Sequence, residues 1–231
     1  MDISKLIELD KQLLLKLNGS DSLFLDGFMW FATTTYIWIP TALALLFILY
    51  KNNDLKTFFF TIVAIALVIT MADQIASSVC KPLFQRWRPT HDPEIMNLVD
   101  VVKGYRGGRF GFISSHAANT FGLTTFIYLL TRKKSILFIM LTWAGISSYS
   151  RIYLGVHYPG DIIAGILVGC LCGLFIYYIY KKVLAYYFKS QYVSQLSSHK
   201  YQSKEVLILF FTFTLTLIFI SILSLMFSNT F

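Results

Sequence analysis

The segment that decides the fold of this chain reads TFFFTIVAIALVITMADQIASSV at residues 57–79 and continues as CKPLFQRWRP at residues 80–89. The first part is almost continuously apolar and provides the roughly 20 residues that a helix needs to cross the hydrocarbon core of a bilayer. The second part places three permanent cations, Lys81, Arg86 and Arg88, close together among prolines. The segment therefore predicts a membrane-spanning helix that ends in a rigid, strongly basic turn.

Apolar runs of the same kind recur along the rest of the chain. They are continuous rather than alternating, and a lipid-exposed backbone must satisfy its own hydrogen bonds, so we expect helices rather than a barrel. Of the 231 residues, 56% are hydrophobic and 14% are charged, against about 25% charged residues in a typical soluble domain. We predict an all-α integral membrane bundle of six transmembrane helices, at 28–49, 57–79, 117–130, 135–150, 161–180 and 206–227.

The N-terminal residues follow a different pattern. They lack the ordered basic, apolar and small-residue regions of a signal peptide, and they carry apolar side chains at helical spacing with polar side chains between them. This pattern predicts an amphipathic helix that lies in the membrane surface. We divide the chain into this interfacial helix at 1–27, a core with five transmembrane helices at 28–204, and a sixth transmembrane helix at 205–231.

A membrane location explains the basic charge of the chain. A net charge of +8 would suggest nucleic acid as the partner of a soluble protein, but lysines and arginines that flank membrane spans face anionic headgroups. We therefore expect the bilayer, and no nucleic acid, as a partner. The three cysteines, Cys80, Cys170 and Cys172, match neither a metal site nor a disulfide framework.

Ionisable residues gather at the ends of the predicted helices on one face of the membrane. The loops at 80–116 and 150–161 are separated by an even number of predicted spans and therefore lie on the same side. Polar groups at membrane depth are costly and usually serve a function. The two loops together supply Lys81, Arg88, Ser114, Ser115, His116, Arg151, His157 and Asp161.

This set of side chains suits a phosphate group. Three cations at one place require an anion of more than one charge, and arginine offers a fork that matches phosphate oxygens. A helix that begins at Ser114 or Ser115 presents unpaired N–H groups, which also favour phosphate. Asp161 follows His157 by one helical turn, so it can fix the imidazole tautomer and leave the other nitrogen free to attack. His116 remains as a general acid, and we expect no metal and no cofactor.

Simpler interpretations exist for these residues taken one at a time. Ser115 can be an N-cap, Pro159 a first-turn proline, and Asp161 an acid that complements the helix dipole. Lys81 and Arg88 can be interfacial anchors. These interpretations explain poorly why all of the residues occur together on one face of the membrane.

Three motifs in this region resemble the signature of the type 2 phosphatidic acid phosphatases, a family that shares its fold with vanadium haloperoxidases. They are Lys81 with Arg88-Pro89, Ile113-Ser114-Ser115-His116, and Ser150-Arg151 with His157 and Asp161. The first and third match fully. The second keeps serine and histidine but lacks the proline and glycine of the family's Pro-Ser-Gly-His. The resemblance covers about 57–180.

The resemblance implies a metal-independent lipid phosphatase that works through a phosphohistidine. His157 is then the nucleophile, Asp161 orients it, and His116 protonates the leaving group. The residues that bind the phosphoryl oxygens are then Lys81, Arg88, Ser114, Ser115 and Arg151. The bacterial members also imply a place in the inner membrane with the site facing the periplasm or the outside. The charge count agrees weakly, with seven lysines and arginines on that face against ten on the other once three site cations are set aside.

The motifs do not decide which lipid is the substrate. We expect undecaprenyl pyrophosphate first and lipid A phosphate second, with phosphatidylglycerol phosphate and phosphatidic acid as further alternatives. A haloperoxidase is disfavoured because that chemistry needs no membrane spans. A transporter or a non-catalytic anion-binding protein is disfavoured because its charges would follow a path through the bilayer. The oligomeric state and the roles of Asp73, Arg106 and Arg109 stay open.

Overall fold

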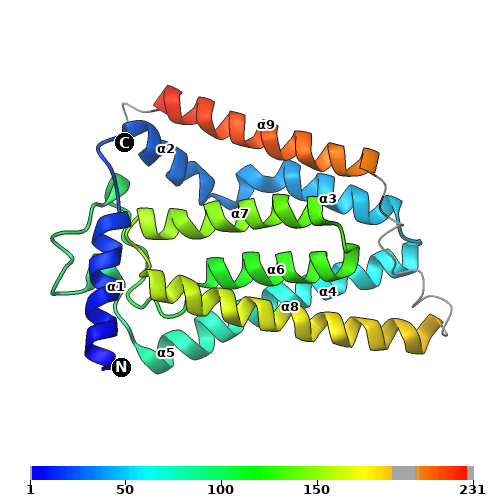
Figure 1. The fold of residues 1–231 in the computed structure, drawn as a ribbon, viewed down its shortest axis with the longest axis horizontal. Helices are drawn as coiled ribbons and strands as arrows, with labels where there is room; N and C mark the ends of the chain where they lie inside the picture. The colour runs from blue at the N-terminus through cyan, green and yellow to red at the C-terminus, as the bar shows by residue number, and fades with distance from the viewer. Residues whose placement is uncertain (1, 189–200, 202, 228–231) are drawn as a thin grey trace.

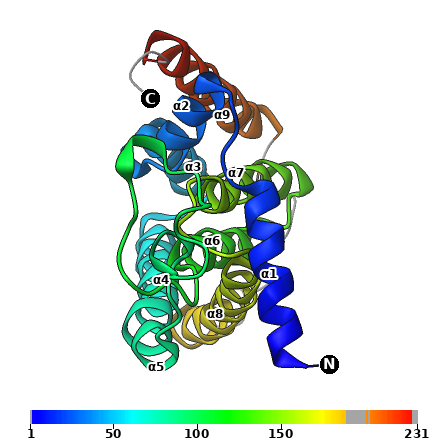
Figure 2. The same cartoon turned by 90° about the vertical axis from the view of Figure 1, so that its left-hand side faces the viewer.

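The computed structural model describes residues 2–188, 201 and 203–227, and within these ranges the protein is all-helical, without a β-strand. Long helices run side by side, and α1 (Ile3–Leu17) lies across one end of them (Figure 1). Figure 2 looks onto that end, with α1 in front of the bundle. The bundle consists of α2 (Leu23–Ala32), α3 (Ile39–Lys51), α4 (Leu55–Gln74), α6 (Ser115–Thr131), α7 (Lys134–Tyr153), α8 (Pro159–Phe188) and α9 (Ser203–Phe227).

The protein is a multi-pass membrane protein. Three helical stretches among the described residues are long and apolar enough to cross a bilayer, namely Leu55–Phe84, Pro159–Tyr187 and Lys204–Phe227. A fourth is added if Leu23–Ala32 and Thr35–Lys51, which meet at a bend of 73°, form one span. Length and composition therefore support three or four crossings, and they do not establish the predicted six.

Two further bundle helices are not long and apolar enough: α6 has only 17 residues, and α7, with 20 residues, is rich in polar side chains near its C-terminus. Both run parallel to the long helices (Figure 1), and α6 packs against α4, α7 and α8. Burial within the bundle allows them to carry side chains that lipid would not tolerate. The buried polar residues are Thr120, Thr124 and Thr131 in α6 and Ser147, Ser148, Ser150 and Arg151 in α7.

The first predicted span begins and bends differently from the prediction. Helix α2 starts at Leu23, so the predicted boundary at residue 27 falls inside a helix. A short 3-10 turn, η1 (Thr35–Trp38), separates α2 from α3 and gives the pair its bend. The bend has a direct local cause, because the chain leaves helical geometry at Thr34, in the extended region, just before η1.

The decisive segment forms a longer helix than expected. Helix α4 continues through a π-helical stretch, η2 (Ile75–Cys80), into α5 (Lys81–Phe84). It ends where Gln85 adopts the left-handed conformation, with φ 45°. Lys81 therefore lies in the last helical turn, and the two arginines follow immediately in an extended segment.

Close packing of α6 on α8 fixes the position of the α6 N-terminus. A Cβ atom at Gly169 would lie 2.2 Å from the Ala118 carbonyl oxygen, and one at Gly165 would lie 2.6 Å from the Ser114 carbonyl oxygen. Glycine at both positions is what lets the two backbones approach, as in other membrane helix pairs. The start of α6 is thereby held against the first turns of α8.

Helix α8 ends later than the sequence predicted. The fifth span was expected at 161–180, but α8 continues to Phe188. The extension carries Lys181 and Lys182, whose long side chains can cover apolar surface while the ammonium groups reach water. The basic connection predicted at 181–205 is therefore helical at its start, and its part at 189–200 lies outside the described residues.

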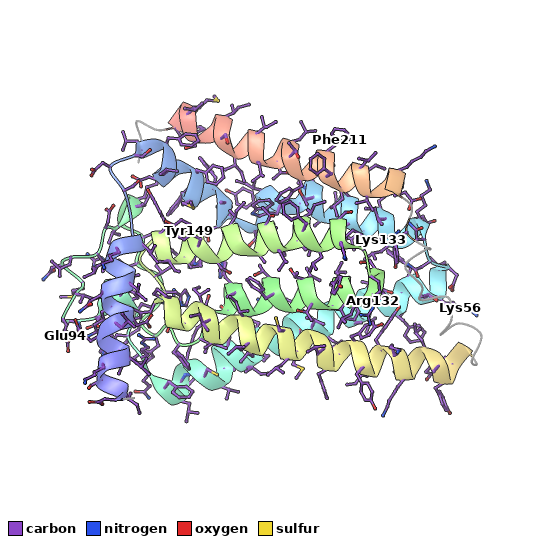
Figure 3. All side chains as sticks on the ribbon, in the orientation of Figure 1. Lys56, Glu94, Arg132, Lys133, Tyr149 and Phe211 are labelled. Carbon is purple, nitrogen blue, oxygen red and sulfur yellow. The ribbon has the colours of Figure 1, made fainter. Side chains whose placement is uncertain are left out.

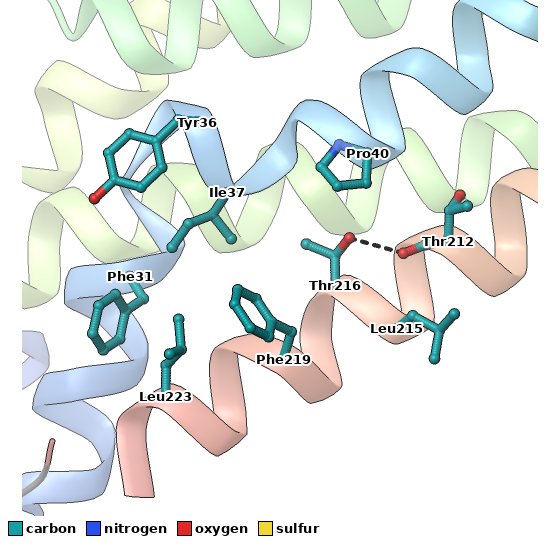
Figure 4. Close-up of a pocket in the computed structure, with 9 residues that line it drawn as sticks. All are labelled: Phe31, Tyr36, Ile37, Pro40, Thr212, Leu215, Thr216, Phe219 and Leu223. Carbon is teal, nitrogen blue, oxygen red and sulfur yellow. Dashed lines mark hydrogen bonds between the residues drawn. The ribbon is translucent and has the colours of Figure 1, made fainter. Parts of the chain in front are cut away.

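Helix α9 packs on the outside of α2 and α3. The hydroxyl groups of Thr41 and Thr216 are hydrogen-bonded across this contact at 3.0 Å. Beside it, a cavity of about 510 Å³ opens between α9 and the bend that follows α2 (Figure 4). Its lining contains aromatic, aliphatic and threonine side chains and no ionisable acid or base apart from the Tyr36 phenol. This cavity therefore offers no charged side chain to an anion.

Candidate active site

The residues singled out in the two loops meet at the end of the bundle that α1 covers. The N-termini of α6 and α8, the C-terminus of α7 and the end of α5 all lie at this end (Figure 1). Arg151 is in the last turn of α7, His157 is in the short connection that follows, and Asp161 is in the first turn of α8. The sequence prediction that the loops share one side is thus reflected in the structure.

His157 and Asp161 form a buried pair. The His157 Nδ1 atom lies 3.4 Å from Asp161 Oδ2, and the side chains are 1% and 0% exposed. The same carboxylate oxygen accepts a hydrogen bond of 3.0 Å from the Tyr158 backbone N–H. With Nδ1 facing the carboxylate, Nε2 is the nitrogen left free.

The charge state of His157 is set by its surroundings. Burial lowers its pKa well below 6.5, and the nearby cations Arg88, Arg151 and Lys81 lower it further. The imidazole is therefore neutral around neutral pH, as a nucleophile requires. The same cations and His157 also interact electrostatically with His116, so the structure brings the basic residues and both histidines into one region.

Arg88 is held by neutral groups. Its Nε donates to the Phe110 carbonyl at 3.1 Å and its Nη1 donates to the Val156 carbonyl at 3.4 Å. Burial and the neighbouring Arg151 lower its pKa. Its positive charge is thus available to a bound anion.

Arg151 is similarly placed between neutral partners. Its Nη1 donates to the Thr33 hydroxyl at 2.7 Å and its Nη2 to the Tyr105 hydroxyl at 3.0 Å. Its Nε is buried and has no hydrogen-bond partner within the described part of the chain. A buried N–H without a partner is costly, and a ligand oxygen at this place would satisfy it.

Lys81 connects α5 with the start of α6. Its Nζ donates to the hydroxyl groups of Ser77 at 3.1 Å and Ser115 at 3.3 Å. The N-cap of α6 is Ser114, whose hydroxyl accepts from the Ala117 N–H at 3.4 Å. The sequence left the start of this helix open between Ser114 and Ser115, and the alternative interpretation of Ser115 as the N-cap is wrong, because Ser114 has that role. The Ser115 hydroxyl faces Lys81 because it is the first residue inside the helix.

His116 borders a cavity of about 250 Å³, which is also lined by Thr33, the hydrogen-bond partner of Arg151. Asn119 also lines it, and the Asn119 Oδ1 atom is buried without a hydrogen-bond partner among the described residues. Trp38 and Trp143 also line the cavity, with their rings edge to face and the ring centroids 6.4 Å apart. The remaining lining residues are Ala32, Thr35, Ile69, Thr120, Leu123 and Ser147.

The glycine-rich stretch at 104–111, which the sequence showed only as a loop, packs directly onto the site. A Cβ atom at Gly111 would lie 3.1 Å from Arg88 Cγ and 3.2 Å from Asp161 Oδ2. Gly107 has φ +65°, and a Cβ there would lie 2.7 Å from Arg88 Nη1. Only glycine allows the loop to come this close.

Arg86 and Asp10 are the residues that the sequence analysis missed. Arg86 Nη1 lies 2.9 Å from Asp161 Oδ1, and Arg86 Nη2 lies 2.8 Å from Asp10 Oδ2 in α1. The guanidinium also lies 4.1 Å from the centre of the Tyr158 ring. Arg86 lies in the basic segment at 80–89, so the sequence could have marked it as a candidate site residue. Nothing in the sequence indicated that it pairs with α1.

Three charged residues left open by the sequence lie beside the site. Arg106 Nη1 donates to the Thr90 carbonyl at 2.9 Å, and the Arg109 guanidinium lies 4.3 Å from the Trp87 ring. Asp73 interacts electrostatically with Lys81. Within the described residues, no group of three or more histidine, cysteine, aspartate or glutamate side chains is arranged to hold a metal ion.

Comparison with known proteins places this geometry in a family. The family model for the PAP2 superfamily matches residues 62–185. The chain belongs to the PAP2 superfamily. It is a phosphatase that acts on lipid phosphates.

Curated relatives share much of their length with the chain. It is 46% identical to a lipid A 4'-phosphatase of Bacteroides thetaiotaomicron over 79% of this chain and 82% of that protein. It is 38% identical to a lipid A 4'-phosphatase of Porphyromonas gingivalis over 76% and 74% of the two chains. An undecaprenyl-diphosphatase of Sulfolobus acidocaldarius is 29% identical over 63% of this chain and 66% of its own. No solved structure matches the chain.

Proposed function

We propose that the protein removes a phosphate group from lipid A. The observation that carries this proposal is the 46% identity to a lipid A 4'-phosphatase across 82% of that protein. Our first expectation from the sequence was undecaprenyl pyrophosphate, with lipid A phosphate second. The relative named undecaprenyl-diphosphatase is only 29% identical to this chain. We therefore place lipid A before undecaprenyl pyrophosphate.

The geometry supports a two-step transfer through histidine. The free Nε2 of His157 attacks phosphorus, while Asp161 holds the Nδ1 proton and stabilises the charge that develops on the ring. His116 gives a proton to the departing sugar oxygen and then takes one from the water that cleaves the phosphohistidine. Inorganic phosphate leaves, and His157 returns to its neutral form.

Charge stabilisation comes from the protein itself in this proposal. Arg88 and Arg151 keep their charge for the phosphoryl oxygens, since all of their observed hydrogen bonds go to neutral groups. Lys81 interacts electrostatically with both arginines and donates to the Ser115 hydroxyl, and Ser114 caps the α6 N-terminus, where free N–H groups favour an anion. No metal is needed for the reaction, so activity should survive excess EDTA, and vanadate should inhibit.

The cavity beside His116 supports a sugar phosphate as substrate. A general acid must lie next to the leaving oxygen, so the cavity that His116 borders receives the leaving group. Its lining is largely apolar, with two indole rings, and hydroxyl and amide groups of Thr33, Thr35, Asn119 and Ser147 stand among them, so it offers a sugar ring both flat apolar faces and hydrogen-bond partners. Its volume of about 250 Å³ fits one such ring rather than the whole lipid.

We further propose a membrane arrangement that agrees with this substrate. Helices α6 and α7 run parallel to the long apolar helices (Figure 1), which supports six crossings, with α9 (Ser203–Phe227) as the sixth. Helix α1 exposes apolar side chains such as Ile3, Leu6 and Ile7, as expected for an interfacial helix. The enzyme core then begins with α2 at Leu23 rather than at residue 28.

The charges at the two ends of the bundle favour a site that faces the periplasm or the outside of a bacterial inner membrane. Figure 3 places Lys56, Arg132 and Lys133 at the end of the bundle opposite α1 and Glu94. By the positive-inside rule, that basic end is cytoplasmic. Single cysteines at Asp100 and Lys133, in a chain without native cysteines, should differ: an impermeant thiol reagent should label position 100 in intact spheroplasts and not position 133.

Phosphate release from a panel of lipids tests the proposed function. The purified protein should release more phosphate from lipid A than from undecaprenyl pyrophosphate, phosphatidylglycerol phosphate or phosphatidic acid at equal surface concentration. His157→Ala serves as the catalytic control. Higher kcat/KM on undecaprenyl pyrophosphate than on lipid A would restore our first expectation and reject the present proposal.

A further inference from the structure

Four residues connect the N-terminal helix to the His157–Asp161 pair. Arg86 donates to Asp161 Oδ1 at 2.9 Å and to Asp10 Oδ2 at 2.8 Å. The other oxygen of Asp10 accepts from the Gly160 backbone N–H at 2.8 Å. Since Gly160 precedes Asp161 in the chain, the hydrogen bonds close a ring. We call Asp10, Arg86, Gly160 and Asp161 the clasp.

The clasp is shielded enough for its charges to matter. The side chain of Asp161 is 0% exposed, that of Asp10 is 14% exposed and that of Arg86 is 24% exposed. Burial lowers the pKa of Arg86, but the two carboxylates outweigh it and the pKa is raised overall. Removing one partner from such a group leaves a shielded charge without compensation. The planar guanidinium can serve both carboxylates at once, which a lysine cannot do as well.

The clasp controls one oxygen of Asp161 while the catalytic pair uses the other. Oδ1 accepts from Arg86, whereas Oδ2 accepts from the Tyr158 N–H and faces Nδ1 of His157. With both oxygens held, the carboxylate cannot rotate about its terminal bond. The orientation of His157 therefore depends on Arg86, and the orientation of Arg86 depends on Asp10.

Helix α1 also contacts the segment that follows Arg88, through Lys11. Lys11 Nζ lies 3.2 Å from Asp92 Oδ2 and 2.5 Å from Glu94 Oε2. Asp92 Oδ2 in turn accepts from the Tyr158 hydroxyl at 2.7 Å. Two neighbouring residues of α1 thus act on the segment 157–161: Asp10 reaches Asp161 through Arg86, and Lys11 reaches Tyr158 through Asp92.

We propose that Arg86 and Asp10 are positioning residues of the phosphatase, and that the docking of α1 on the bundle aligns the nucleophile His157 through the clasp. This inference rests on the proposed function, since it takes His157 as the attacking group. It gives α1 a role beyond membrane attachment. A helix bound at the membrane surface becomes part of the machinery that orients the reacting nitrogen.

The test uses the full-length protein in lipid vesicles and compares Asp10→Asn with Glu8→Gln. Both variants neutralise one acid of α1, but Glu8 is exposed and its side chain accepts a hydrogen bond from Gln12 of the same helix. Asp10→Asn keeps the shape that accepts from Gly160 and removes the charge that faces Arg86. We expect its kcat to fall about tenfold, with the KM and the inhibition constant of inorganic phosphate within about twofold, because misplacement of a reacting group affects the chemical step. Glu8→Gln should match the wild type.

Arg86→Gln and the double variant complete the cycle. We expect Arg86→Gln to lower kcat by about 10²-fold, and Asp10→Asn should add little in its presence because both act on the same carboxylate. If the effects of the two substitutions on kcat multiplied in the double variant, Asp10 and Arg86 would not act through the same carboxylate. A kcat of Asp10→Asn equal to that of wild type, or a loss confined to KM, would overturn the clasp while the proposed function stands. A wild-type protein inactive on every lipid phosphate would overturn both.

Discussion

Arg86 and Arg88 are separated by one residue, yet they occupy opposite electrostatic environments. Arg86 lies between the carboxylates of Asp10 and Asp161. Arg88 has backbone carbonyls as its hydrogen-bond partners and the cation Arg151 nearby. The pKa of Arg86 is raised by its partners, despite the opposing effect of burial, whereas burial and Arg151 lower the pKa of Arg88.

This difference separates a cation that serves the protein from one that serves the substrate. A guanidinium already neutralised by two acids offers little to an incoming anion, but it can hold those acids in place. A guanidinium held by dipoles alone keeps its charge, and a bound phosphate would relieve its repulsion with Arg151. The two arginines can therefore be told apart by which kinetic constant each substitution changes.

The largest expected effect comes from His157, the proposed nucleophile near which both arginines act. His157→Ala should lower kcat by about 10⁴-fold or more, because it removes the attacking atom and not merely its orientation. Phosphate release from lipid A in vesicles measures it, with circular dichroism to show that the helices are intact. If His157→Ala kept a turnover near that of the wild type, His157 would not be the nucleophile, and the proposed roles of the two arginines would fall with it.

Arg88→Gln should have the next largest effect. Loss of one charge donor to the transition state typically costs about 10²–10³-fold in rate, and here the inhibition constant of inorganic phosphate or vanadate should also rise. The matching change Arg86→Gln should leave that constant almost unchanged. Steady-state kinetics with both inhibitors measure the two variants side by side. Equal weakening of inhibitor binding in both would mean that the two arginines share one role.

The pH profile should separate the arginines further. The pKa of His157 is lowered by burial and then by Arg88, so the wild-type nucleophile stays neutral well below pH 6.5. Removing Arg88 raises this pKa, and a protonated imidazole cannot attack, so the acidic limb of kcat/KM should move up in pH in Arg88→Gln. Arg86 is not among the largest causes of this shift, so Arg86→Gln should move the limb less than Arg88→Gln does. Profiles on the same lipid provide the measurement, and identical limbs in all three proteins would contradict it.

The candidate site residues could be predicted from the sequence, but the residues that hold them in position could not. Lys81, Arg88, His116, Arg151, His157 and Asp161 could be selected because polar residues are rare at membrane depth and because their spacing resembles a family signature. Arg86 and Asp10 could not, since their pairing joins the first helix to a segment far along the chain. Such a contact leaves no periodicity or spacing to detect.

The fold shows the same division between local and non-local information. Continuous apolar runs predicted the helices that lipid surrounds. They could not predict that α4 continues through η2 into α5, or that α2 and α3 meet at 73°, because these features depend on packing against neighbours. The number of crossings also depends on α6 and α7, whose buried polar residues are tolerated only because other helices cover them.

The smallest expected effect concerns the ring on which Arg86 lies. Tyr158 contributes a hydroxyl that donates to Asp92 at 2.7 Å and a ring face 4.1 Å from the Arg86 guanidinium. Tyr158→Phe removes only the hydroxyl, and Asp92 keeps its contact with Lys11, so we expect about 1 kcal/mol less stability and a kcat within about threefold. Tyr158→Leu also removes the ring face, a contact worth about 0.5–2 kcal/mol, and should lower kcat about tenfold as Arg86 loses its orientation. Thermal unfolding in detergent and steady-state kinetics measure both variants. If Phe and Leu at this position lowered kcat equally, the hydroxyl rather than the ring would support Arg86, and the contrast between the two arginines would rest on the carboxylates alone.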